Sequence, residues 1–196
     1  MSQNQPNPFH SSRLIYRALE STDEPFIHTL ESEPQGFINS QLALKKPQST
    51  RETKKHFEHY TEKCILGCAI CLPGEGENDA PKPIGVICLE PLEPENAHHR
   101  HTDMGLGLLP DYQGKGYGSE AIEWALQWAF LDAGLHRVGI KAFQYNTGAR
   151  KLYEKLGFKL EGTAREIWWH AGRWWDDVQF GMLEKEWRER REGRVE

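Results

Sequence analysis

The sequence predicts an α/β fold in which about four helices flank a mixed, mostly antiparallel sheet of about seven strands. Short apolar runs alternate with segments of helical periodicity, in the order strand, two helices, three strands, helix, strand, helix, two strands. Such an order implies layers of helix packed on sheet. A chain of 196 residues can bury a core within one domain, and it shows no internal repeat or interdomain linker. We expect a domain at residues 13–187, after a disordered lead at 1–12 and before a charged tail at 188–196.

The first third of the chain carries one strand and two helices. Residues 13–17 are a short strand candidate. Residues 21–25 combine a cap residue, acids in a first turn and a proline tolerated there, so a helix begins at this point. After a loop-like stretch, Ser49 or Thr50 caps a second helix that continues to about residue 63.

Three strands and a long helix follow. Apolar runs at 64–72 and 84–89 flank a polar, glycine-bearing segment, as expected for a long hairpin loop. A strand at 101–109 leads into a glycine-rich turn. The helix after that turn, at 116–133, has an apolar stripe at helical spacing and ends at Gly134.

The last third predicts a strand, a helix and a hairpin. The strand covers residues 136–143, and the helix at 146–156 ends at a glycine. Two strands at 158–169 and 174–183 form the hairpin about residues 170–173. In the tail, Trp187 is the candidate anchor.

Composition excludes several classes of protein. The formal net charge of −5 argues against nucleic-acid binding, which needs a basic surface. The chain has no apolar run near the roughly 18 residues of a membrane span, and its polar start is no secretory signal. Four cysteines do not suggest a disulfide scaffold. We therefore expect a cytoplasmic protein without nucleic-acid or membrane partners.

The most informative stretch is the glycine-rich turn, in which Gly114, Gly116 and Gly118 alternate after Gln113. Glycines let the backbone approach a ligand, and a helix start offers unpaired N–H groups with partial positive charge. These features suit a pyrophosphate, although a tight turn before a helix would give the same pattern. The spacing fits neither G-x-G-x-x-G nor G-x-x-x-x-G-K-[ST]. It fits Gln-x-x-Gly-x-Gly.

A second stretch decides between a turn and an anion site. The residues from Asn146 to Phe158 match N-x-x-A-x-x-L-Y-x-x-x-G-F at every specified position. Together with the Gln113 turn, this motif resembles the GNAT N-acetyltransferases. Residues 12–20 followed by Asp23 are similar to the opening of the RimJ/RimL-like branch, the ribosomal-protein N-terminal acetyltransferases. The resemblance covers about residues 12–187.

The resemblance implies that acetyl-CoA is the co-substrate. In the family, loop amides hold the pyrophosphate, the strand before the loop pairs with the pantetheine arm, and the Asn contacts the cofactor. The residues so implied are Gly107, Leu108, Leu109, Gln113, Gly114, Lys115, Gly116, Tyr117, Gly118, Ser119, Asn146 and Tyr153.

Proton transfer needs an acid for the leaving thiolate and a base for the amine. Tyr153 matches the family's general acid, since a phenol with a pKa of about 10 is protonated at neutral pH. The alternative is that Tyr153 only packs. Lys141 stands where some relatives have a Glu, so Asp103 on the strand before the loop is the candidate base. His101 and an ordered water remain alternatives.

Two groups of residues invite a metal interpretation. Cys64, Cys68 and Cys71 lie in a strand-like run, where alternation puts Cys64 and Cys68 on one face and Cys71 on the other, so we interpret them as small buried hydrophobes. The histidines at 98–101 lack a carboxylate or cysteine at ligand spacing and indicate a solvated loop. We therefore predict no metal.

Four of the seven tryptophans lie on the predicted hairpin. Alternation places one of each pair inward and the other outward. We expect Trp168 and Trp175 to form either an acceptor wall or a protein interface.

The expected function is transfer of an acetyl group to a primary amine by direct attack in a ternary complex. The acceptor is a protein N-terminus, a lysine or a small amine, and the protein is a monomer or homodimer. The alternative is a catalytically silent acyl-CoA-binding or regulatory module on the same fold.

Overall fold

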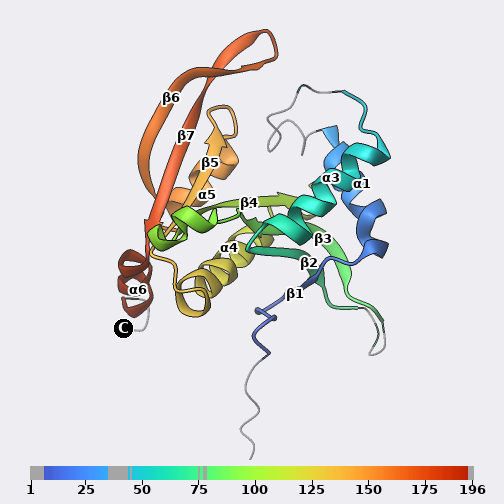
Figure 1. Cartoon of the computed structure of the whole chain (residues 1–196), viewed down its shortest axis with the longest axis horizontal. Coiled ribbons are helices and arrows are strands. Elements are labelled where there is room, and N and C mark those ends of the chain that lie inside the picture. The colour runs from blue at the N-terminus through green and yellow to red at the C-terminus, as the bar shows by residue number, and fades with distance from the viewer. Residues whose placement is uncertain (1–6, 35–43, 45, 75, 77–78, 194–196) are drawn as a thin grey trace, which may run out of the picture.

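The computed structural model describes residues 7–34, 44, 46–74, 76 and 79–193. Seven strands form one sheet in the order β1-β2-β3-β4-β5-β7-β6 (Figure 1). The strands are β1 (Ile15–Ala18), β2 (Leu66–Leu72), β3 (Lys82–Leu89), β4 (His101–Leu108), β5 (Arg137–Phe143), β6 (Lys159–His170) and β7 (Arg173–Leu183). Only β4 and β5 pair in parallel. The predicted mixed, mostly antiparallel sheet is confirmed.

Helices cover both faces of this sheet (Figure 1). They are α1 (Glu24–Ser32), α3 (Thr50–Glu58), α4 (Tyr117–Gln127), α5 (Thr147–Lys155) and α6 (Glu184–Glu192). α1 buries Ile27 and Leu30 in one core cluster, whereas α4 buries Ile122 and Leu126 in the other. None of the described helices is long and apolar enough to span a lipid bilayer.

Strands β4 and β5 separate part of the way along the sheet. Their register runs from the pair His101–Arg137 to the pair Met104–Ile140 and stops there. Beyond this point β4 continues to Leu108 paired only with β3, and β5 continues to Phe143 paired only with β7. The sheet therefore opens into a gap whose β4 side leads directly into the glycine-rich turn.

The structure corrects the predicted lead and gives a fold to the predicted tail. Trp124 Nε1 donates to the Pro8 carbonyl at 2.9 Å, so the described part of the lead, residues 7–12, lies against α4 instead of being disordered. Residues 188–192 continue α6, whose Trp187 is 2% exposed, and the tail is helical there because this anchor holds it. Residues 1–6 and 194–196 lie outside the described residues.

Two helices end in a wider turn than the periodicity predicts. The second helix begins at the Ser49 cap, which forms a capping box with Glu52, and it closes with a π-helical turn, η2 (His59–Lys63). α4 ends likewise in η5 (Trp128–Asp132). These extensions account for the predicted helix ends near residues 63 and 133.

The hairpin of β6 and β7 extends beyond the rest of the sheet (Figure 1). Ala171 at φ 51° and Gly172 at φ 79° form its two-residue turn, a geometry that matches the twist of paired strands. The pair Trp168–Trp175 faces one side, and Trp169 and Trp174 are exposed on the other. The predicted alternation of the tryptophans is confirmed.

Candidate active site

The glycine-rich turn packs against the strand before it and against α5. Gly116 is the N-cap of α4 with φ 85°, and Gly114 has φ 70°, so both adopt the left-handed conformation that favours glycine. A Cβ at Gly118 would lie 3.4 Å from Leu106 Cδ2 and 3.7 Å from Leu152 Cδ2. The first turn of α4 therefore sits at the open end of the β4–β5 gap, where it contacts the helix of the second sequence motif.

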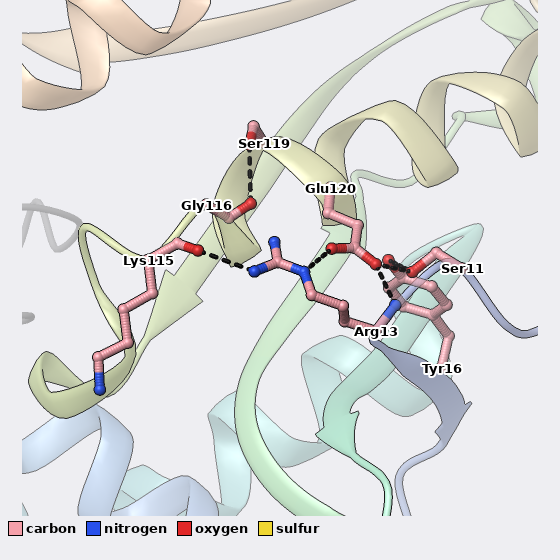
Figure 2. Close-up of polar contacts among 7 residues, drawn as sticks. All are labelled: Ser11, Arg13, Tyr16, Lys115, Gly116, Ser119 and Glu120. Carbon is pink, nitrogen blue, oxygen red and sulfur yellow. Dashed lines mark hydrogen bonds and ion pairs between the residues drawn. The ribbon is translucent and has the colours of Figure 1, made fainter.

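Two side chains hold the carbonyl groups of this turn (Figure 2). Arg13 Nη1 donates to the Lys115 carbonyl at 3.0 Å, and Ser119 Oγ donates to the Gly116 carbonyl at 2.7 Å. In a planar trans peptide the carbonyl and the following N–H point in opposite directions, and the described chain has no cis peptide. Fixing these carbonyls therefore turns the N–H groups of Gly116 and Tyr117 away from Arg13 and Ser119, which suits an anion on the other side of the turn.

Glu120, in the first turn of α4, binds Arg13 through its carboxylate (Figure 2). Its carboxylate accepts the backbone N–H of Arg13 at 2.6 Å, Arg13 Nε at 2.8 Å and Ser11 Oγ at 2.7 Å. Burial alone would raise the pKa of Glu120, but the hydrogen bonds from Ser11 and Arg13 lower it below its usual value. This contribution of Arg13 was not visible in the sequence, because 102 positions separate it from Lys115.

This geometry predicts that Arg13→Gln weakens the binding of CoA about tenfold, since it frees the Lys115 carbonyl and removes a cation beside the turn. Binding of CoA, measured by calorimetry, should be compared with the turnover of acetyl-pantetheine, which has no pyrophosphate. Arg51→Gln, at an exposed site on α3, is the charge-matched control. An equal loss with both donors would contradict a role at the pyrophosphate.

The residues of β4 whose backbone groups face the gap differ from those predicted to pair with the pantetheine arm. The Leu109 N–H donates to the Ile84 carbonyl, and the Glu90 N–H donates to the Asp103 carbonyl, both at 2.9 Å. Alternate residues of an antiparallel pair exchange these bonds, so Gly107 and Leu109 direct their N–H and C=O groups to β3. The expected backbone pairing of Gly107 and Leu109 is wrong for this reason.

Leu106 and Leu108 are the residues whose backbone groups face the gap. They lie beyond the last β4–β5 pair, so β5 does not pair with them. The Gln113 amide donates to the Leu108 carbonyl at 2.8 Å and holds the end of the strand. Gln113 thus contacts the strand, whereas the sequence indicated a place near the pyrophosphate.

Tyr153 lies on α5 at the other side of the gap. Its ring packs in the core at 5.8 Å from Phe180 and 6.0 Å from Phe158. Burial raises the pKa of its hydroxyl to about 12. Among the described residues no group forms a hydrogen bond with this hydroxyl. Asn146 is the N-cap of α5, where its side chain accepts the Ala149 N–H at 3.1 Å.

Asp103 lies where β4 and β5 are still paired. Its Oδ2 is 2.6 Å from Lys141 Nζ. Lys141, which stands where some relatives have a Glu, is therefore the ion-pair partner of Asp103, the candidate base. The Oδ1 of Asp103 occupies space that a Cβ at Gly139 would need. His101 is exposed at the start of β4, farther from the gap.

The hairpin contributes an aromatic surface next to the end of β5. Trp168 packs edge to face on Phe143, and Trp175 on Tyr145. The buried Asp177 accepts Trp168 Nε1 at 3.2 Å. Aromatic faces and a carboxylate together suit a cationic group.

Comparison with known proteins identifies the family. The Acetyltransferase (GNAT) domain model matches residues 13–159, so the chain belongs to the GNAT acetyltransferases. It is 34% identical to the SPbeta prophage-derived uncharacterized N-acetyltransferase YokL of Bacillus subtilis, over 88% of this chain and 91% of that protein. It is 29% identical to the spermidine N(1)-acetyltransferase of Vibrio cholerae, over 93% of this chain and 99% of that protein. The chain is accordingly an acetyl-CoA-dependent acetyltransferase.

A solved structure supports the same assignment. The crystal structure of spermidine N-acetyltransferase from Vibrio cholerae in complex with CoA and spermine superposes with a TM-score of 0.74 at 26% identity. The alignment covers 91% of this chain and 99% of that one. The alternative of a silent binding module is not favoured by these relatives.

Proposed function

We propose that this enzyme acetylates a primary amine on a small cationic acceptor, by direct attack of the amine on the thioester in a ternary complex. The observation that carries the proposal is the β4–β5 gap, with the glycine-rich turn at its open end and, packed against that turn, the α5 helix that carries Tyr153. The aromatic surface of Trp168 and Trp175, with Asp177 behind it, supports a cationic acceptor. Similarity to a spermidine acetyltransferase adds to this support.

In this proposal each group of the chain has one task. The N–H groups of Gly116 and Tyr117 bind the pyrophosphate, and the backbone of Leu106 and Leu108 aligns the pantetheine arm. Tyr153 donates its proton to the departing thiolate. These tasks place the thioester between the two arms of the sheet.

A panel of acceptors tests the substrate class. Diamines, spermidine and spermine should release CoA thiol faster than lysine-containing peptides or peptides with free N-termini, including sequences of ribosomal proteins. A preference for the N-terminal peptides would replace the small-amine proposal with the RimJ/RimL-like activity. No turnover of any amine, with CoA binding intact, would favour the silent module.

We propose Asp103 as the group that accepts the proton of the amine, directly or through water. Asp103→Asn should lower kcat about 10²-fold with little change in the KM for acetyl-CoA, because proton transfer is lost and the donor site is untouched. Steady-state kinetics with the best acceptor measures this.

Lys141→Met is the matched control for Asp103. It removes the ion-pair partner and keeps the carboxylate, so kcat should fall much less than in Asp103→Asn. If both variants lose the same activity, the ion pair has a structural role, and water or His101 becomes the candidate base.

A further inference from the structure

A second group of reactive side chains lies at the junction of η2, β2 and β3, outside the residues used for acetyl transfer. It contains His59, Cys64 and Glu90, whose ligand atoms all lie within 4.8 Å of one another. His59 Nε2 is 3.1 Å from Glu90 Oε2. Within the described residues, no other set of three or more His, Cys, Asp or Glu side chains converges in this way.

The backbone at this junction fixes all three residues. The Cys64 N–H donates to the His59 carbonyl at 3.0 Å and closes the π-helical turn. The next residue, Ile65, donates to the Leu89 carbonyl at 3.0 Å, which joins this segment to the end of β3. The Glu90 N–H in turn donates to the Asp103 carbonyl. Local backbone hydrogen bonds thus hold the three residues side by side, within reach of a common ion.

The donor set has a specific chemistry. An imidazole nitrogen, a thiolate sulfur and a carboxylate oxygen are the three kinds of atom that bind zinc in proteins, whereas Mg²⁺ and Ca²⁺ prefer oxygen alone. A second sulfur is close, since Cys88 Sγ is 3.9 Å from Glu90 Oε1. His59, Cys64 and Glu90 are each partly exposed, so an ion can reach them from solvent.

The sequence predicted no metal, because Cys71 was expected on the opposite face of a strand from Cys64 and Cys68. The structure does place Cys68 and Cys71 in opposite core clusters. Cys64, however, precedes β2, and its partners are His59 and Glu90. We propose that His59, Cys64 and Glu90 form a zinc-binding site that joins η2 to the end of β3.

Cobalt tests the site, because Co²⁺ takes zinc positions and reports its ligands by absorption. The full-length protein, reduced and treated with chelator, should bind one equivalent of Co²⁺. The complex should show a thiolate-to-cobalt charge-transfer band, which stoichiometric Zn²⁺ then removes. Cys64→Ser should abolish the band, and His59→Gln should weaken Co²⁺ binding by more than about 100-fold, beyond the loss typical of outer-sphere partners.

Two variants act as controls. Cys68→Ser changes a buried thiol away from the site and should keep the band. His98→Gln tests adventitious binding by the exposed histidines at 98–101 and should also leave the band unchanged. Circular dichroism confirms that each variant is folded. Absence of a thiolate band, or a band that survives in Cys64→Ser, would overturn the proposal.

Discussion

Gly116→Trp should abolish the binding of CoA and leave the protein folded. Gly116 has φ 85°, and a Cβ there would lie 3.2 Å from Arg13 Nη2. An indole would displace Arg13 from the Lys115 carbonyl, so the peptides that orient the N–H groups of Gly116 and Tyr117 would no longer be held. Losing two hydrogen bonds to a charged phosphate, at about 1.5–3 kcal/mol each, weakens binding at least about 100-fold.

Calorimetry with CoA measures this effect, and Gly134→Trp is the matched control. Gly134 also has a positive φ, 64°, and no atom lies within 4 Å of an added Cβ. Both variants carry the same left-handed strain of roughly 1–2 kcal/mol. Only Gly116→Trp should lose CoA, and unchanged binding in that variant would refute the assignment of the turn.

Tyr153→Phe should lower kcat by roughly 10²- to 10⁴-fold, the usual contribution of a positioned proton donor. CoA binding should change little, because the hydroxyl forms no hydrogen bond with any described residue and the ring packing is kept. Steady-state rates and calorimetry on the same preparation separate the two effects. Equal turnover in wild type and variant would remove Tyr153 from the mechanism.

The same variant gives a prediction for stability against pH. Burial raises the pKa of Tyr153 to about 12, above the value of about 10 in an unfolded chain. The folded state then holds its proton more tightly, so the contribution is fully present below pH 10 and is lost as the pH rises toward 12. The loss is on the order of 3 kcal/mol of unfolding free energy, for a pKa difference of about two. Urea unfolding should show Tyr153→Phe losing less stability than wild type over this range.

Local patterns in the sequence mark the two segments that we propose as the donor site. The glycine turn and the motif from Asn146 to Phe158 depend on residue type and spacing along one segment, and the structure places both at the β4–β5 gap. The order of strands and helices along the chain was equally accessible, since hydrophobic periodicity reports it. The orientation of the β4 backbone was not, because register with β3 decides whether Leu108 or Leu109 faces the gap.

The sequence by itself determined the fold class and the family, and its motifs mark the segments that we propose hold acetyl-CoA. The tertiary structure decided how distant side chains complete these segments: Arg13 on the turn, Lys141 on Asp103, and His59 with Cys64 and Glu90. The physical reason is the range of the forces involved. Hydrophobic periodicity and backbone conformation depend on residues a few positions apart in the chain. Ion pairs and ligand sets form between distant residues, which only the packed sheet brings within a few ångströms.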